Sequence, residues 1–144
     1  MDCFSEHNKT QKIVFMKPTQ VGGTEVLINA IGYVIDHNPG PIMLVQPTLD
    51  LAKRWSRQRF NDLCANTKPI KKLIKPVVAK DQGNTLLEKE FRDGYLIITG
   101  GNSSASLRSM PAQFVFLDEV DEFPEDLDGQ GDTVALAERR ATTY

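Results

Sequence analysis

The stretch from Lys17 to Thr24, KPTQVGGT, contains the residue types that bind a phosphate group. Two adjacent glycines let the backbone approach an anion without a Cβ atom in the way, and an apolar, helical pattern follows them. The N–H groups at the start of such a helix converge on an anion. Lys17 adds an ammonium group and Thr24 a hydroxyl group, so the stretch predicts a phosphate-binding loop.

The loop departs from the usual pattern G-x-x-x-x-G-K-[ST] at two positions. Gly22 and Thr24 fit, but Lys17 stands where the first glycine belongs, and Gly23 stands where the lysine belongs. We expect the Lys17 side chain to fold back over the phosphates from the opposite end of the loop. A plain strand-to-helix turn with an incidental lysine explains this stretch, taken alone, equally well.

Two adjacent carboxylates, Asp118 and Glu119, follow the apolar run FVFL at 114–117. In nucleotide hydrolysis an aspartate at such a place holds the shell of a Mg²⁺ ion, and a neighbouring glutamate polarises the attacking water. Ligands of an open parallel sheet lie beyond the carboxyl ends of its strands, and both motifs follow a predicted strand. Taken alone, the carboxylate pair could equally be an acidic loop at the end of a sheet. Together with the Lys17 loop, the pair predicts a nucleotide site.

Apolar runs and turn signals predict the elements that position these residues. Strands are predicted at 13–16, 42–46 and 114–117, and a hairpin at 84–91 and 95–99. Helices are predicted over about 26–35, 49–65 and 70–74, with a helical turn at 105–109. The first helix is apolar nearly all the way round and should be buried. The order favours one α/β domain over residues 1–144, with a mostly parallel sheet flanked by helices.

Charges are sorted along the chain, although the net charge of the 144 residues is only −2. Residues 51–80 contain nine basic residues and one acid, whereas 118–138 contain nine acids and no basic residue. A charge run is usually a solvated face, but the basic block is also the best candidate surface for nucleic-acid phosphates. The side chains predicted to face DNA are Arg54, Arg57, Lys68, Lys71, Lys72 and Lys75. No run approaches the roughly 20 apolar residues of a membrane span.

Four segments resemble the ATPase domain of the large terminase subunit of tailed bacteriophages, in the lambda-type group. They are MKPTQVGGTE, LVQPTLDLAKRW, AERRATTY and GNTLLEKEFRDGYLIITGGNSSASLRSMPAQFVFLDEVDEFPEDLDGQGD. The resemblance runs from about residue 13 to residue 144. It implies a P-loop NTPase fold of the ASCE type that hydrolyses ATP with Mg²⁺ to package double-stranded DNA, with the nuclease in a separate C-terminal domain.

The resemblance also implies roles for individual residues. Lys17 matches the displaced lysine of the Walker A motif, and the pair Asp118 and Glu119 matches Walker B. Arg108 matches an arginine that reaches the γ-phosphate in cis or from a neighbouring subunit, with a salt bridge inside its loop as the alternative. The phosphate cradle would be Gln20, Val21, Gly22 and Gly23, and the ligands of Mg²⁺ would be Thr24 and Asp118.

The partners implied are double-stranded DNA, the small terminase subunit and the portal of the procapsid, with a possible homo-oligomer on the portal, in the cytoplasm of the bacterial host. The coupling motif and nuclease carboxylates of the family are not found in these residues. We therefore expect a fragment that alone binds nucleotide weakly or not at all. Two alternatives stay open: a helicase-type ATPase, because Gln46-Pro47-Thr48 precedes a predicted helix, and a non-catalytic remnant that serves as an interaction module.

Overall fold

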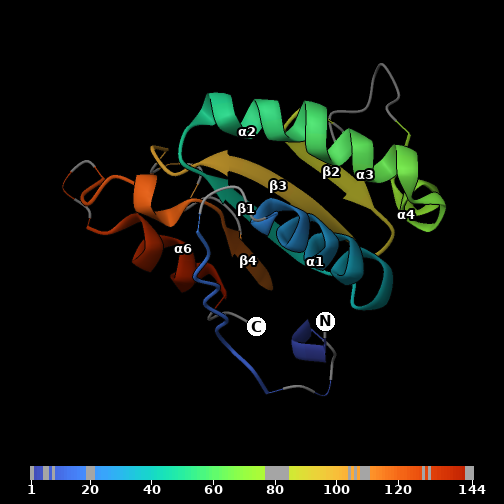
Figure 1. Cartoon of the computed structure of the whole chain (residues 1–144), viewed down its shortest axis with the longest axis horizontal. Helices are drawn as coiled ribbons and strands as arrows, with labels where there is room; N and C mark the ends of the chain where they lie inside the picture. The colour runs from blue at the N-terminus through green and yellow to red at the C-terminus, as the bar shows by residue number, and fades with distance from the viewer. Residues whose placement is uncertain are drawn as a thin grey trace.

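The protein is built on a four-stranded sheet in the order β2-β3-β1-β4 (Figure 1). The computed structural model describes residues 2–4, 7, 9–18, 22–76, 85–103, 105, 107, 111–127, 129 and 131–141. β1 is parallel to both β3 and β4, while β2 runs antiparallel to β3. The carboxyl ends of three strands therefore meet at one edge of the sheet. The strands are β1 (Pro41–Gln46), β2 (Glu88–Phe91), β3 (Gly94–Gly100) and β4 (Phe114–Leu117).

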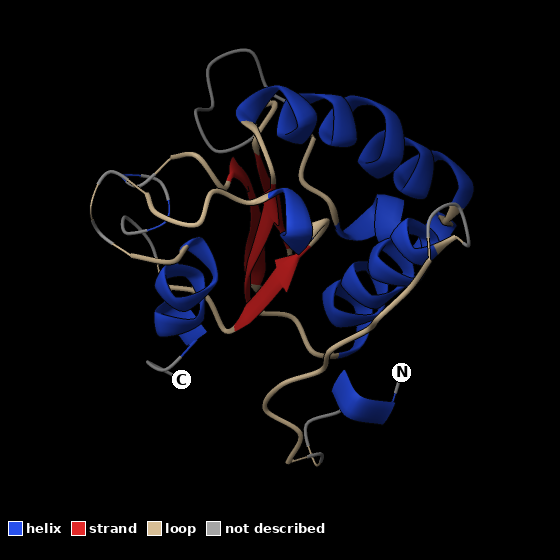
Figure 2. Ribbon diagram, turned by 60° about the vertical axis from the view of Figure 1, so that its left-hand side comes forward, coloured by secondary structure: helices blue, strands red, loops and turns tan. Residues whose placement is uncertain are grey.

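Helices cover both faces of the sheet (Figure 2). Ile42 and Leu44 of β1 pack in one core with α1 and with the helical run that follows β1, while Met43 and Val45 pack in a second core with α6. Alternate side chains of a strand point to opposite faces, and a strand covered on both faces is apolar throughout. The helices are α1 (Gly23–His37), α2 (Leu49–Trp55), α3 (Asn61–Asn66), α4 (Lys68–Leu73) and α6 (Thr133–Ala141).

Most of the predicted elements are present. The strands at 42–46 and 114–117 and the hairpin correspond to β1, β4 and the β2–β3 pair. The helix predicted over 49–65 is a continuous helical run, in which a π-helical turn, Ser56–Phe60, separates α2 from α3. Thr48 is its N-cap and accepts a hydrogen bond from the Leu51 N–H at 3.3 Å. The helical turn predicted at 105–109 lies mostly outside the described residues.

The strand predicted at 13–16 is wrong. Residues 9–18 have no regular structure and are exposed, and Val14 and Met16 are 75% and 92% exposed. Strand-forming side chains make a strand only where backbone partners and a face to bury are used; β1 is paired on both sides, by β3 and β4, and residues 9–18 pair with no strand of this sheet. An ion pair of 2.5 Å between Lys12 and Glu138 connects the extended segment to α6.

The first helix is amphipathic rather than buried all round, which corrects the prediction. Ile31 and Val34 are fully buried, but Val26 is 49% exposed and Asn29 also faces solvent. The sheet covers only one side of α1, so the apolar residues on its other side have no surface to pack against. In the described part of the chain, no helix is long and apolar enough to cross a membrane.

Candidate nucleotide-binding site

The parallel strands bring three segments together at their carboxyl ends. β1 ends at Gln46, β3 ends at Gly100, and Asp118 follows β4. The backbone N–H of Gly101 donates to the carbonyl oxygen of Gln46 at 2.6 Å, and that of Asp118 donates to the carbonyl oxygen of Val45 at 3.1 Å. These bonds hold the loops after β3 and β4 beside the end of β1.

The carboxylate of Asp118 is held by a hydrogen bond from the end of β1. The Gln46 Nε2 group donates to Asp118 Oδ2 at 3.2 Å, and the two residues are only 5% and 6% exposed. A buried carboxylate is costly unless hydrogen bonds or a cation compensate it. No other hydrogen bond to this carboxylate is found in the described part of the chain. The remaining acceptor sites of Asp118 are therefore suited to a cation or to water.

Glu119 differs from Asp118 in both exposure and backbone conformation. It is exposed, and its φ of 54° lies in the left-handed region, which residues with a Cβ atom rarely adopt. This conformation costs roughly 1 kcal/mol in a residue other than glycine. A 3₁₀ turn, Val120–Glu122, follows directly. The strained turn thus gives two consecutive carboxylates different surroundings, one buried at the sheet edge and one in solvent.

No side chain of the described residues caps the N-terminus of α1. Its N-cap residue is Gly22, with a φ of 77°. The N–H groups of the first helical turn carry a partial positive charge and need acceptors. A left-handed residue followed by helical residues also directs successive N–H groups toward one point. The start of α1 is therefore suited to an anion.

The side chain of Lys17 lies over Gly23, the first residue of α1. A Cβ atom added to Gly23 would overlap the Lys17 Cδ atom and would lie 2.5 Å from its Cε and 3.3 Å from its Nζ. The lysine arm is thus folded back toward the N-terminus of α1. Thr24 follows in the same turn and is partly buried. These groups fit a phosphate, because a lysine arm lies beside a helix N-terminus that no described side chain caps.

Three predicted site residues, Gln20, Val21 and Arg108, lie outside the described residues. Among those described, no hydrogen bond or ion pair joins the Lys17 loop to Asp118 or Glu119. Nor does the described part contain three His, Cys, Asp or Glu side chains grouped to hold a metal. The chemistry fits Mg²⁺ nevertheless, since this ion takes one or two carboxylate ligands and keeps several waters.

Comparison with known proteins identifies the family of this chain. The family model for "Phage terminase large subunit gpA, ATPase domain" matches residues 1–144. The chain belongs to this family. It is also similar to the terminase large subunit of Enterobacteria phage P21, with 24% identity over 141 residues. That alignment covers 97% of this chain and 22% of the P21 protein, so the chain spans about a fifth of the length of this curated relative. No solved structure gives a significant match.

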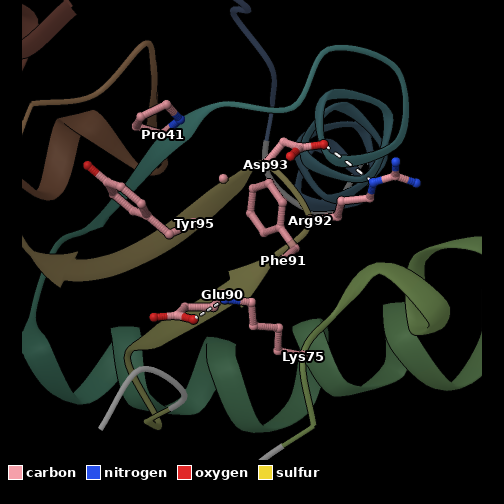
Figure 3. Close-up of a pocket in the computed structure, with 8 residues that line it drawn as sticks. Pro41, Lys75, Glu90, Phe91, Arg92, Asp93 and Tyr95 are labelled. Atoms are coloured by element: carbon pink, nitrogen blue, oxygen red, sulfur yellow. Dashed lines mark hydrogen bonds and ion pairs between the residues drawn. The ribbon is translucent and has the colours of Figure 1, made fainter. Parts of the chain in front are cut away.

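An open cavity in this terminase-family domain lies away from the Gln46–Asp118 pair at the carboxyl ends of the strands (Figure 3). It has a volume of about 610 Å³ and lies beside Pro41, where β1 begins, whereas Gln46 is at the other end of the strand. Its charged side chains are already paired, Lys75 with Glu90 at 2.7 Å and Arg92 with Asp93 at 3.5 Å. The remaining lining residues are Phe91, Gly94 and Tyr95. This cavity is therefore not the nucleotide site.

The basic residues predicted to face DNA lie on the run from α2 to the end of α4. Arg54 and Arg57 are exposed and form no ion pair among the described residues. Lys68, Lys71 and Lys72 are exposed on α4. Lys75 lies after α4 and pairs with Glu90. Figure 1 shows α2, α3 and α4 following one another along one side of the molecule.

Gln46 is the site residue that the sequence reasoning missed. The triplet Gln46-Pro47-Thr48 resembles a helicase motif, and the signal that could have indicated Gln46 is a polar residue at the end of the apolar run 42–45. A further contact lies beside the loop, where Arg59 donates to Glu25 Oε1 at 3.0 Å. It connects the π-helical turn to the first turn of α1, which follows the glycines.

Proposed function

We propose that this chain is the nucleotide-binding part of a P-loop ATPase of the ASCE type, working in a motor that moves double-stranded DNA into a phage procapsid. Membership of the terminase ATPase-domain family supports this proposal. The observation that carries it is the Lys17 arm, folded over Gly23 at the uncapped N-terminus of α1. An ammonium group and helix N–H groups directed at one place are what the binding of a triphosphate requires.

In this proposal the loop binds the triphosphate of ATP. Lys17 contacts the β- and γ-phosphate oxygens, and the backbone N–H groups of the cradle donate to the phosphates. The cradle comprises Gln20, Val21, Gly22 and Gly23. Arg108 reaches the γ-phosphate, in cis or from a neighbouring subunit.

The sheet edge would handle the metal and the water. Asp118 and Thr24 would hold Mg²⁺, which when bound neutralises charge on the phosphate oxygens. The Gln46 amide keeps the Asp118 carboxylate in one orientation. Glu119, exposed beside it, orients the attacking water and accepts its proton.

The exposed basic residues from Arg54 to Lys72 would contact the DNA backbone. Arg54 and Arg57 support this, because neither forms an ion pair within the described part of the chain. Contacts of this kind fix register on the duplex and carry no sequence information. A motor that moves along DNA of any sequence needs this property.

The whole protein would act with further partners. We propose the small terminase subunit, the portal of the procapsid and other copies of the same chain on the portal, all in the cytoplasm of the bacterial host. The expected weak activity of the chain alone belongs to the same proposal, so nucleotide binding and hydrolysis are to be measured on the full-length protein.

Lys17→Ala in the full-length protein tests the nucleotide site. Loss of one charge-assisted phosphate contact in a sheltered site costs roughly 2 to 4 kcal/mol, a factor of about 30 to 1,000 in ATP affinity or turnover. Titration calorimetry with ATP·Mg²⁺ and phosphate release measure the two quantities. Lys12→Ala is the matched control, because Lys12 lies in the same extended segment but pairs with Glu138.

Unchanged binding and hydrolysis in Lys17→Ala would show that this loop is not the phosphate site. Turnover stimulated by single strands rather than by duplex DNA would favour the helicase alternative. A folded protein that binds no ATP·Mg²⁺ at all would favour the non-catalytic interaction module.

A further inference from the structure

The backbone of α1 does not require glycine at position 23. Gly22 has a φ of 77° and benefits from the absence of a Cβ atom, but the φ of Gly23 lies outside the left-handed region. Gly23 is the first residue of α1, and alanine is favoured over glycine within helices. Another feature of its surroundings must explain the glycine.

The space beside Gly23 is occupied by the arm of Lys17. The Cδ, Cε and Nζ atoms of this lysine are the three nearest atoms to the position where a Cβ would stand. A Cβ added to Gly22, by contrast, meets no atom within 4 Å. Gly23 is accordingly buried, although it begins the helix. The lysine arm thus takes the place of a side chain at position 23.

We propose that Gly23 is a positioning residue for Lys17: the missing side chain makes the place in which the lysine arm lies against the first turn of α1. This inference rests on the proposed function, in which Lys17 binds phosphate. Lys17 is exposed and forms no ion pair in the described part of the chain, and its arm lies against Gly23. A methyl group at position 23 would displace the arm and move the ammonium group away from the first turn of α1.

Four versions of the full-length protein test the pairing: wild type, Gly23→Ala, Lys17→Ala and the double variant. In the wild-type background, Gly23→Ala should weaken ATP·Mg²⁺ binding by about tenfold or more, because the charge-assisted contact is lost. The melting temperature should stay equal or rise, since alanine is the better helix former. In the Lys17→Ala background, the same change should alter affinity less than about twofold, because interacting residues are not additive. Gly32→Ala, within α1 and away from Lys17, is the control.

The outcomes separate this inference from the proposed function. Equal losses from Gly23→Ala in both backgrounds would overturn the inference, because glycine would then serve the approach of the backbone to phosphate. Unchanged affinity of Gly23→Ala in the wild-type background would overturn it as well, even where Lys17→Ala impairs binding. If Lys17→Ala itself has no effect, the proposed function fails, and with it the premise of the inference.

Discussion

Replacing Gln46 with Met tests whether the strand end holds the Asp118 carboxylate. Met has a side chain of similar length but no hydrogen-bond donor. The substitution therefore removes the 3.2 Å hydrogen bond and creates almost no cavity. Gln46 and Asp118 are only 5% and 6% exposed, so a water molecule cannot readily take the place of the lost amide donor. A hydrogen bond to a charged group contributes about 1.5 to 3 kcal/mol. The free energy of unfolding should fall by about this amount, and the Mg²⁺ concentration needed for half-maximal ATP hydrolysis should rise.

Urea unfolding of the chain can be followed by the fluorescence of Trp55, the one tryptophan, which is 4% exposed. Gln58→Met, at an exposed position of the π-helical turn, is the matched control and should change stability by less than about 0.5 kcal/mol. In the Asp118→Asn background, Gln46→Met should cost clearly less, because the charged acceptor is gone. A Gln46→Met protein with wild-type stability and wild-type Mg²⁺ dependence would refute the reasoning.

Three further predictions concern other parts of the molecule. Glu119→Gln should bind ATP·Mg²⁺ but hydrolyse it roughly 10² times more slowly or worse, and near-normal turnover would point to Asp121 or Glu122 as the base. Replacing exposed basic residues with Ala should reduce the salt dependence of duplex binding by about one unit of slope per lost phosphate contact. An unchanged slope would mean that these basic residues form a solvated face that does not contact DNA. Lys53→Ala is the control, because Lys53 pairs with Asp50 at 3.6 Å. The variants are Arg54→Ala, Arg57→Ala, Lys68→Ala, Lys71→Ala and Lys72→Ala. Burial raises the pKa of the Cys64 thiol, and the Lys89 ammonium opposes this only in part. At pH 8 a smaller fraction of Cys64 is therefore thiolate than for a cysteine with the ordinary pKa. Exposed Cys3 should therefore be alkylated first by iodoacetamide, as peptide mass spectrometry can measure, and equal rates would contradict the shift.

The sequence by itself determined the elements whose signals are local. Apolar runs predicted β1 and β4, and the turn Arg92-Asp93-Gly94 predicted the hairpin. Strand-end placement also identified Asp118 as a site candidate, because the carboxyl ends of parallel strands share one edge. The helix α6 was not predicted from the sequence. Asp132 was the available signal, because it accepts hydrogen bonds from the N–H groups of residues 134 and 135, as a helix cap does.

The tertiary structure alone decided which residues meet. Residues 13–16 have strand-forming side chains, but whether they form a strand depends on a free partner in the sheet. The bond from Gln46 to Asp118 joins residues 72 positions apart, and it exists only because β4 lies parallel to β1. The contact of Lys17 with Gly23 likewise depends on the path of the loop, since spacing in the sequence sets how far a side chain can reach and not where it lies. Local patterns specify elements because their hydrogen bonds and periodicity are local, whereas a site requires distant segments to be packed together.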